Sequence, residues 1–499
     1  MATFPVHRHL HIPPNPSGIP SNISNSKNPK MEFYQLTLTL LVCFFSGCAS
    51  KSDIPIGYSV TVPVPLEFNE GFKGKAFILE IGNSEPNFRA ALSVEAMNNL
   101  KRYSCSLQVF LGDTKVWSSG HFSPFYPSQR CVLELRKDGE LRLMGARRRV
   151  GWRTNTSGEG VERLQLLITG NLVLADAMNN IKWQSFDFPT DVMLWSQVLK
   201  ASAHLTSFST NSSELNSYSL EVQNNKIALY LNSGTWKYPY WEFRPSKSQN
   251  SAFAELGSTG LKLFNVRHRR IAQISPTRYE PVRFLALNNK TGNLGLYYYS
   301  VDKRKFEASY QALNRTCDLP QACKPYSICN TPSNSCTCIE ISGSREGLNP
   351  SLGSDCSEEF SSEFCNVSTG PVEMVELKGI SSNLMSNNQI YNISKDSCSS
   401  SCLANCSCVA ALYSAGGCFL YGLVSGMKQV DRGVGLSYYL VKVPKGIGKN
   451  HRKSSRLKNL LLVMGGILDG LVLLVLGGFA FYYFVIRKRR KDSSGNDST

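Results

Sequence analysis

Cysteines carry the clearest chemical signal in this sequence. Sixteen occur in 499 residues, and twelve of them fall between positions 317 and 418. The first six of these are spaced C-x5-C-x5-C-x6-C-x-C-x17-C, with no histidine among them. Closely spaced thiols bind zinc or form disulfides; the absent histidine and the cysteine count favour disulfides in an oxidising compartment. The predicted half-cystines are Cys105, Cys131, Cys317, Cys323, Cys329, Cys336, Cys338, Cys356, Cys365, Cys398, Cys402, Cys406, Cys408 and Cys418.

A cluster of arginines could bind an acidic ligand. The chain has a net charge of +17, and seven basic residues but only three acidic ones lie between Cys131 and Arg153. Such a strip could attract an acidic polysaccharide or an acidic peptide, and the alternative is an ordinary solvated face. An oxidising compartment excludes nucleic acid as a partner. The candidate acidic-ligand patch consists of Arg147, Arg148, Arg149 and Arg153.

Residues for catalysis are sparse. The sequence contains no H-E-x-x-H, no G-x-S-x-G and no Gly-rich phosphate loop. A glycosidase needs only two carboxylates, which a sequence cannot exclude by motif. The four histidines after position 50 are His121, His204, His268 and His451, widely separated along the chain. We therefore predict no enzymatic activity, no cofactor and no metal site.

A short apolar run near the N-terminus predicts secretion. Residues 36–45 are apolar and are followed by the small-residue site Gly47-Cys48-Ala49, which is typical of a signal peptide. A membrane anchor is the alternative, but the run is too short to span about 30 Å of hydrocarbon. We assign residues 1–49 to a leader and signal peptide, which removes Cys43 and Cys48 from the mature chain.

A second, longer apolar run predicts a membrane span. We expect a basic juxtamembrane segment at 445–458, a transmembrane helix at 459–486 and a cytoplasmic tail at 487–499 that begins with five basic residues. The expected product is a single-pass type I plasma-membrane protein with its ectodomain outside. Asp469 would pair with a basic residue or form part of a dimer face, or else lie in the outer headgroup layer.

Seven N-x-S/T sequons agree with a secreted ectodomain. Each sequon alone is weak evidence, but their scatter along one ectodomain is typical of a glycoprotein. They begin at Asn155, Asn211, Asn289, Asn314, Asn366, Asn392 and Asn405.

The ectodomain begins with a repeat built on tryptophan. Trp152 lies thirteen residues after Gly139, Trp183 lies thirteen residues after Gly170, and Trp117 precedes both. Each unit reads as a Gly turn, an alternating strand and a Trp-bearing strand, which predicts antiparallel β structure. We predict three small sheets that bring their indoles together in one core; chance hairpins in a sandwich are the alternative.

The string Trp183-Gln-Ser-Phe-Asp-Phe-Pro-Thr-Asp191 resembles the bulb-type mannose-binding lectin domain of plant S-domain receptor-like proteins. The resemblance implies a β-prism of three four-stranded sheets, which we place at residues 50–200. The sugar-site strand of that family reads Gln-x-Asp-x-Asn-x-Val-x-Tyr, and this chain departs from it in both matching strands. We therefore expect the fold to be kept and mannose binding to be lost. The degenerate positions are Arg136, Asp138, Glu140, Arg142, Thr169, Asn171 and Val173.

The rest of the ectodomain resembles the same receptors. Asn225–Tyr230 and Thr291–Tyr297 repeat features of the lectin strands, so we assign 201–312 to a second, diverged lectin-like (S-locus glycoprotein-like) β domain. The C-x-C at Cys336 and Cys338 resembles an EGF-like module, placed at 313–357. The string Cys398-Ser-Ser-Ser-Cys402-Leu-Ala-Asn-Cys-Ser-Cys408 resembles an α+β PAN/apple domain, placed at 358–444, whose usual role is contact with proteins or glycans.

Disulfide pairing in the EGF-like stretch follows only from the resemblance, since spacing alone allows fifteen connectivities. The resemblance implies first with third, second with fourth and fifth with sixth, which are Cys317–Cys329, Cys323–Cys336 and Cys338–Cys356. Cys105 and Cys131 are the two that remain in the lectin region, and we pair them.

The leading hypothesis is a mainly β, kinase-lacking receptor-like membrane glycoprotein. It would bind a carbohydrate or peptide ligand, or pair with a receptor kinase or itself through the PAN domain and the span, as a co-receptor or decoy. The alternative is an adhesion lectin that anchors acidic cell-wall polysaccharide to the plasma membrane. The arginine patch is the observation that supports this alternative.

Overall fold

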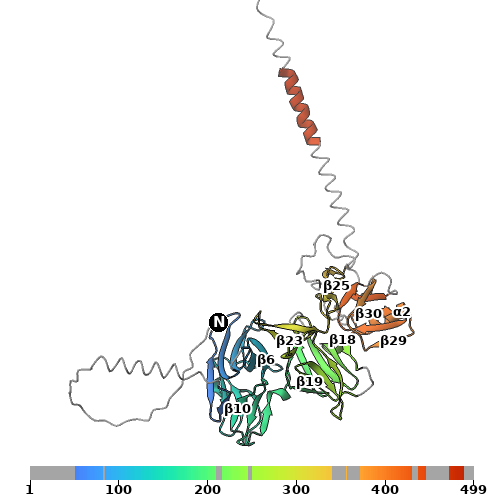
Figure 1. Cartoon of the computed structure of the whole chain (residues 1–499). Coiled ribbons are helices and arrows are strands. Elements are labelled where there is room, and N and C mark those ends of the chain that lie inside the picture. The colour runs from blue at the N-terminus through green and yellow to red at the C-terminus, as the bar shows by residue number, and fades with distance from the viewer. Residues whose placement is uncertain are drawn as a thin grey trace, which may run out of the picture. The chain divides into compact units, whose positions relative to one another are not determined.

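The computed structural model describes residues 51–82, 85–209, 216–245, 250–339, 356, 371–429, 437–444 and 471–487. The chain divides into two compact units, residues 1–321 and 322–499, which are taken here one at a time (Figure 1). Both units are built mainly of β-strands, as the sequence predicts.

The first unit opens with a prism of three four-stranded antiparallel sheets. The chain first forms strands β1, β2 and β3, one for each sheet. The next nine strands then form three antiparallel meanders of three, which join first β3, then β2 and last β1. The sheets are therefore ordered β3-β4-β5-β6, β2-β7-β8-β9 and β1-β10-β11-β12. The strands are β1 Asp53–Pro55, β2 Ser59–Pro63, β3 Lys73–Ile81, β4 Phe88–Met97, β5 Arg102–Leu111, β6 Thr114–Ser118, β7 Arg130–Leu135, β8 Leu141–Met144, β9 Val150–Arg153, β10 Arg163–Leu166, β11 Leu172–Ala175 and β12 Ile181–Gln184.

Alternating side chains and glycine turns produce these sheets. In β7 every second side chain is buried, the pattern of a strand with one face on the core. Gly170 turns the chain between β10 and β11 with a φ of 83°, and a Cβ there would lie 2.4 Å from the Phe88 ring. Only glycine meets both the conformation and the close approach.

The three tryptophans meet in the centre of the prism. Each follows a β-bulge in the last hairpin of its sheet, at the same register position: Trp117 opposite Val109, Trp152 opposite Leu143, and Trp183 opposite Leu174. Their ring centroids are 5.8–6.4 Å apart, all edge-to-face. The predicted pooling of indoles is confirmed, and edge-to-face geometry is the arrangement that aromatic quadrupoles favour.

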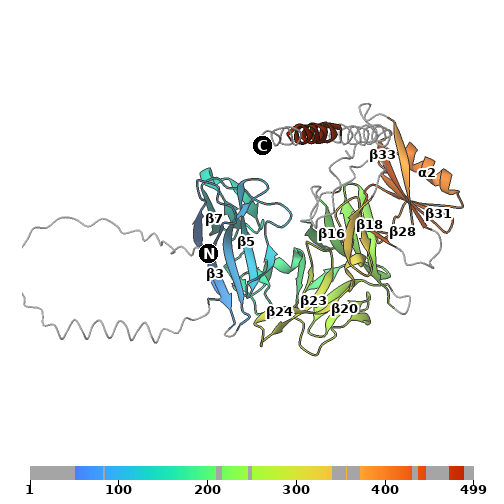
Figure 2. The ribbon, with the colours of Figure 1, turned by 90° about the horizontal axis from the view of Figure 1, so that it is seen from above.

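A second prism repeats this topology in full (Figure 2). Its sheets read β15-β16-β17-β18, β14-β19-β20-β21 and β13-β22-β23-β24. The strands are β13 Val192–Leu194, β14 Val198–Lys200, β15 His204–Phe208, β16 Ser217–Gln223, β17 Lys226–Ser233, β18 Trp236–Phe243, β19 Phe253–Gly257, β20 Gly260–Phe264, β21 Arg270–Ile274, β22 Phe284–Leu287, β23 Leu294–Ser300 and β24 Lys305–Gln311.

This pairing corrects the boundary that we expected at residue 200. Strands β13 and β14 precede that position yet pair with β22 and β19 of the second prism. The second prism therefore begins by Val192, directly after the string that resembles the lectin signature. The sequence hid this boundary because the opening strands of a prism pair with segments some 50–90 residues away.

The second unit is an α+β domain with two sheets. A five-stranded sheet ordered β27-β33-β30-β31-β29 packs against helix α2, and a four-stranded sheet is ordered β26-β25-β32-β28. The elements are β25 Ser327–Asn330, β26 Ser335–Cys338, β27 Val372–Lys378, β28 Ile380–Ser382, β29 Gln389–Tyr391, α2 Lys395–Ala404, β30 Ala410–Ser414, β31 Gly417–Tyr421, β32 Met427–Gln429 and β33 Ser437–Pro444.

The smaller sheet joins two regions that the sequence analysis treated as separate modules. Strand β25 of the EGF-like stretch runs parallel to β32, with Ile328 opposite Met427. The expected boundary at residue 357 therefore separates strands that share one sheet. Strands β25 and β32 are so far apart in the sequence that no local sequence pattern predicts their pairing.

Disulfides hold the cysteine-rich elements in place. Bonds join Cys105 to Cys131, Cys323 to Cys336 and Cys338 to Cys356, the pairings expected for these six. Cys398 and Cys402, one turn apart on the buried face of α2, bond to Cys418 and Cys408. Cys317, Cys329 and Cys406 are also disulfide-bonded.

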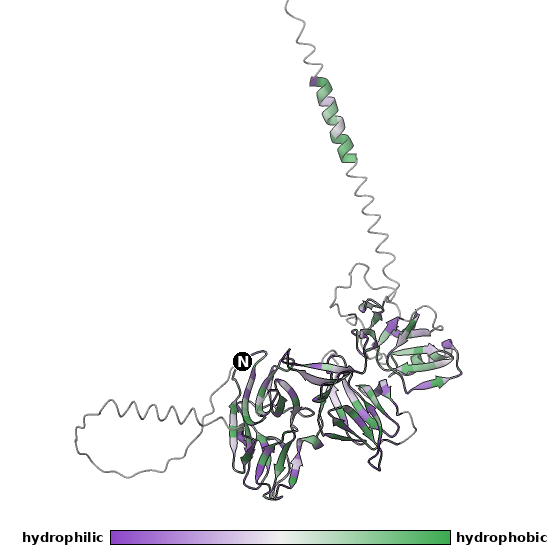
Figure 3. Cartoon of the chain, in the orientation of Figure 1, coloured by the Kyte–Doolittle hydropathy of each residue, from purple (hydrophilic) through white to green (hydrophobic). Residues whose placement is uncertain are grey.

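Near the C-terminus, residues 471–487 form a helix that is largely apolar (Figure 3). Of the helices that the structure describes, none combines the length and the apolar character needed to cross a bilayer. The predicted signal peptide, Asp469, Cys365, Asn211 and Asn366 lie outside the described residues.

Candidate functional site

The strands that correspond to the sugar-site strand are the third in each sheet. In the first prism these are β5, β8 and β11, and the positions named from the sequence lie on β8 and β11 or in the turns before them. The structure places the expected residues on these strands and in the turns before them, and it shows what each side chain binds instead of a sugar.

Asn171 is committed to the fold. It is buried, and its Nδ2 donates to Gln184 Oε1 at 2.8 Å. Its Oδ1 accepts from Ser185 Oγ at 3.1 Å, while its backbone N–H donates to Thr169 Oγ1 at 3.4 Å. Val173 is buried as well. The Asn171 side chain is thus engaged in hydrogen bonds within the protein.

The charged side chains of residues 136–144 form ion pairs within their own sheet and turn. Arg142 donates to Glu134 Oε2 through Nε at 2.9 Å and Nη2 at 2.7 Å. Arg136 lies 3.3 Å from Asp138, whose carboxylate also accepts from the Glu140 backbone N–H. These bonds lower the pKa of Asp138, although its partial desolvation acts the other way. A sugar here would have to displace charged pairs.

Strand β23, already expected from the sequence to repeat a lectin strand, also matches part of the family's sugar-site pattern, and this match was not predicted. Thr291-Gly-Asn-Leu repeats Thr169-Gly-Asn-Leu, and its asparagine is again followed four residues later by the position where the family has tyrosine. Here that residue is Tyr297, so β23 keeps both the asparagine and the tyrosine of the family pattern. This spacing was the available signal.

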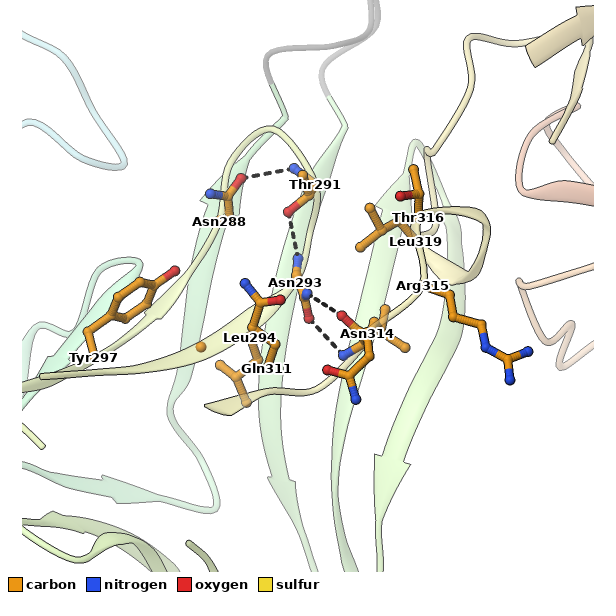
Figure 4. Close-up of a pocket in the computed structure, with 12 residues that line it drawn as sticks. Asn288, Thr291, Asn293, Leu294, Tyr297, Gln311, Asn314, Arg315, Thr316 and Leu319 are labelled. Carbon is orange, nitrogen blue, oxygen red and sulfur yellow. Dashed lines mark hydrogen bonds between the residues drawn. The ribbon is translucent and has the colours of Figure 1, made fainter. Parts of the chain in front are cut away.

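A pocket of about 230 Å³ lies at this strand (Figure 4). Asn293 donates through Nδ2 to Leu313 O at 2.7 Å and accepts from Leu313 N–H at 3.0 Å, so it too is committed to the fold. Gly295 stands where the family has valine, and a Cβ there would meet the Tyr297 ring at 2.7 Å. Tyr297 stacks on Phe284 with centroids 4.9 Å apart, and burial raises the pKa of its hydroxyl.

Two sequons restrict this pocket. Asn314 lines it and Asn289 lies in the turn beside it, and both side chains are exposed. A glycan on Asn314 would occupy the mouth of the pocket. The Tyr297 pocket is therefore a weaker candidate for an external ligand than its position on the family strand suggests.

The arginine patch forms the tip of the β8–β9 hairpin. A 3-10 turn, η1 Ala146–Arg148, holds Arg147 at φ 54° and Arg148 at φ 57°, with Arg149 N–H donating to Ala146 O at 3.2 Å. Two successive positive φ values define a type I′ turn, which normally contains Asn-Gly. Arg147, Arg148, Arg149 and Arg153 are exposed, and among the described residues none of the four has an acidic partner within 4 Å.

Comparison with known proteins identifies both units. A D-mannose binding lectin family model matches residues 114–214, and a PAN-like domain model matches residues 374–436. The chain thus contains a lectin-like and a PAN-like domain, and it is similar over most of its length to S-receptor-like kinases and to a PAN domain-containing protein. The lectin match crosses from the first prism into the second, in agreement with their shared topology.

Three relatives illustrate the relationship. A G-type lectin S-receptor-like serine/threonine-protein kinase of Arabidopsis thaliana is 25% identical over 75% of this chain and 46% of its own length. A PAN domain-containing protein of Arabidopsis thaliana is 28% identical over 71% of each chain. EP1-like glycoprotein 3 of Arabidopsis thaliana is 24% identical over 76% of this chain and 91% of its own length. The chain thus spans about half the length of the kinase that it matches.

Proposed function

We propose that this protein is a receptor-like glycoprotein of the cell surface. It would bind an extracellular ligand or a partner receptor through its lectin-like prisms and PAN domain, as a co-receptor or decoy. One observation supports this best: two prisms and a PAN-like domain occur together, in a chain related both to receptor kinases and to proteins named only for their PAN domain or glycoprotein character.

The proposal includes glycosylation and a type I orientation in the plasma membrane. Asn155, Asn289, Asn314 and Asn392 are exposed, so each sequon is accessible to the modifying enzyme. Lectin and PAN-like domains bind rather than catalyse, so we propose no enzymatic role for the protein.

Affinity purification of the tagged full chain from cross-linked plant plasma membranes tests this proposal. We expect a kinase-bearing receptor to be enriched over a control single-pass glycoprotein, and glycosidase treatment to increase the mobility of the chain on a gel. If no receptor kinase is enriched, the co-receptor role is wrong. If the glycosidase changes nothing, the cell-surface topology is wrong.

A second function, adhesion to acidic polysaccharide, is supported by the Arg147–Arg148 turn. Four exposed arginines, which have no acidic partner within 4 Å in the described part of the chain, offer positive charge to a polyanion. The turn holds Arg147 and Arg148 in a left-handed conformation that is unfavourable for arginine. A left-handed backbone costs about 1–2 kcal/mol for each such residue. Strain of this kind often accompanies a functional requirement.

The double substitution R147N/R148G separates binding from folding. Asn-Gly suits a type I′ turn, so we expect stability to rise by about 1–2 kcal/mol while binding to pectin at low salt weakens roughly tenfold. Salt titration should show a shallower dependence for the variant because two charges are gone. Pectin pull-down and thermal unfolding measure the two effects.

The turn of residues 266–270 provides a matched control. It joins β20 to β21 in the second prism, the hairpin that corresponds to β8–β9, and Arg267 and Arg269 are exposed there. R267N/R269N removes the same charge elsewhere, so a change in pectin binding equal to that of R147N/R148G would assign the effect to net charge and remove the role of the Arg147–Arg148 turn.

A further inference from the structure

A second pocket lies where the two prisms of the first unit meet. It has a volume of about 350 Å³ and is lined by Phe122, from the loop after β6, and by side chains of β15, β16 and β17. This volume falls within the range of about 300–1,000 Å³ that is usual for small-molecule sites. We call it the inter-prism pocket.

The inter-prism pocket differs from the sugar-site strands already described. In the sheet β15-β16-β17-β18, the strand corresponding to β11 is β17, and the residue opposite the bulge is Leu229. Counting back from Leu229 as from Leu174 makes Lys226 and Ala228 the counterparts of Asn171 and Val173. Neither lines the pocket, to which β17 contributes only Asn232.

Two exposed phenylalanines form one wall. Phe122 is 55% exposed and Phe208 is 36% exposed, and their rings lie edge-to-face with centroids 6.2 Å apart. Large apolar side chains exposed beside polar groups in a concave site are typical of a binding surface.

His121 fixes this wall across the prism boundary. Its ring lies 4.7 Å from that of Phe122 and 5.4 Å from that of Phe208, and its Nε2 donates to Thr206 O at 2.7 Å. Burial lowers the pKa of His121, so the ring is neutral at pH 7 with its proton directed to that carbonyl. The loop that carries Phe122 is therefore held before any ligand arrives.

The floor of the inter-prism pocket is polar and already balanced in charge. Asn232 Nδ2 lies 3.4 Å from Ser217 Oγ and 3.2 Å from Ser219 Oγ, which in turn donates to Glu221 Oε1 at 3.0 Å. The other oxygen of Glu221 pairs with Lys237 at 2.7 Å. His204 lies opposite Glu221 on β15 and is exposed.

We infer that the inter-prism pocket binds one pyranose ring of a neutral polysaccharide. The C–H face of the ring would lie on Phe122 and Phe208, and its hydroxyls would bond to Ser217, Asn232 and Glu221. A purely apolar ligand would remove water from this polar floor without hydrogen-bonding to it, and a polyanion would face the Glu221 carboxylate. Because Glu221 and Lys237 neutralise each other, the pocket favours an uncharged ligand over an anionic or a cationic one.

This inference deepens the proposed function, on which its biological setting depends. The test uses the glycosylated full chain in detergent, titrated by calorimetry with cellohexaose, mannohexaose, xylohexaose and, as the acidic comparison, hexagalacturonate. We expect at least one neutral hexasaccharide to bind. Phe122→Ala and Asn232→Ala should each weaken that binding at least tenfold.

Tyr279→Ala is the matched control, because Tyr279 is a fully exposed aromatic residue outside the inter-prism pocket. It should bind as the unaltered chain does. The inference is overturned if no neutral hexasaccharide binds, if only hexagalacturonate binds, or if F122A and N232A bind normally. Enrichment of a receptor kinase with the chain in these cases would leave the proposed function intact and remove only the sugar site.

Discussion

Replacing Trp117 by alanine is expected to lower the stability of the first prism by about 3–5 kcal/mol. Trp117 is buried against Trp152 and Trp183, and its Nε1 donates to Phe188 O at 2.9 Å. The substitution leaves a cavity among three sheets and an unpaired carbonyl, and neither neighbouring indole can move without leaving its own sheet. We expect Trp117→Ala to lower the stability of the prism more than any substitution on its surface, because the Trp117 ring contacts residues of all three sheets.

Hydrogen exchange of the full chain measures this effect locally, since a chain of several domains does not unfold in two states. Peptides from β6, β9 and β12 should exchange about a hundredfold faster or more. Trp195→Ala is the control, because Trp195 is 50% exposed and its loss should change little. Equal protection in both variants would show that the indole cluster does not hold the three sheets together.

The same register explains what the sequence revealed about the fold and what it concealed. In the first prism all three positions that follow the bulge are tryptophan, so the repeat is visible in the sequence. In the second prism these positions are Trp241, Ala272 and Tyr310. The bulges are retained in the second prism, but the side chains that follow them differ. The repeat is therefore only weakly visible in the sequence of the second prism.

The candidate sites show a similar division. The sequence identified Asn171 and Arg142 as residues of the degenerate sugar-site strands. It gave no sign that Ser185 and Glu134 bind them, because those partners lie on other strands or turns. Phe122 and Asn232 were not noticed at all. They are 110 positions apart and share no motif, and only the packing of one prism on the other brings them to one pocket.

In the second unit, the cysteine pattern predicted the PAN-like fold, but the residue that closes it has no motif. Lys442 on β33 is fully buried, and its Nζ donates to the carbonyl oxygens of Cys402 at 3.1 Å, Asn405 at 3.0 Å and Cys408 at 3.2 Å. These carbonyls lie at the C-terminal end of α2, where the helix dipole favours a cation. A lysine in a strand of alternating residues would ordinarily be placed on the solvent side.

Lys442→Met is therefore expected to destabilise the second unit by about 3–5 kcal/mol, because methionine fills the space but removes three hydrogen bonds from a charged donor. The carbonyl oxygens of Cys402 and Asn405 would keep only the backbone N–H groups of Asn405 and Cys408 as donors. Burial lowers the pKa of Lys442, so removing the charge recovers part of its desolvation cost, but methionine cannot replace the hydrogen bonds that the ammonium group donates. The disulfides Cys398–Cys418 and Cys402–Cys408 would keep α2 attached while its C-terminal end loosens.

Exchange of peptides from β30 and β33 measures the loss, and Lys378→Met on neighbouring β27 is the control. Lys378 is 76% exposed and lies 4.0 Å from Glu376, so its replacement should leave protection nearly unchanged. Protection of β33 in Lys442→Met equal to that in Lys378→Met would mean that the disulfides alone fix the helix. The predicted difference would instead show that one buried cation joins the helix to the sheet where the cysteine pattern ends.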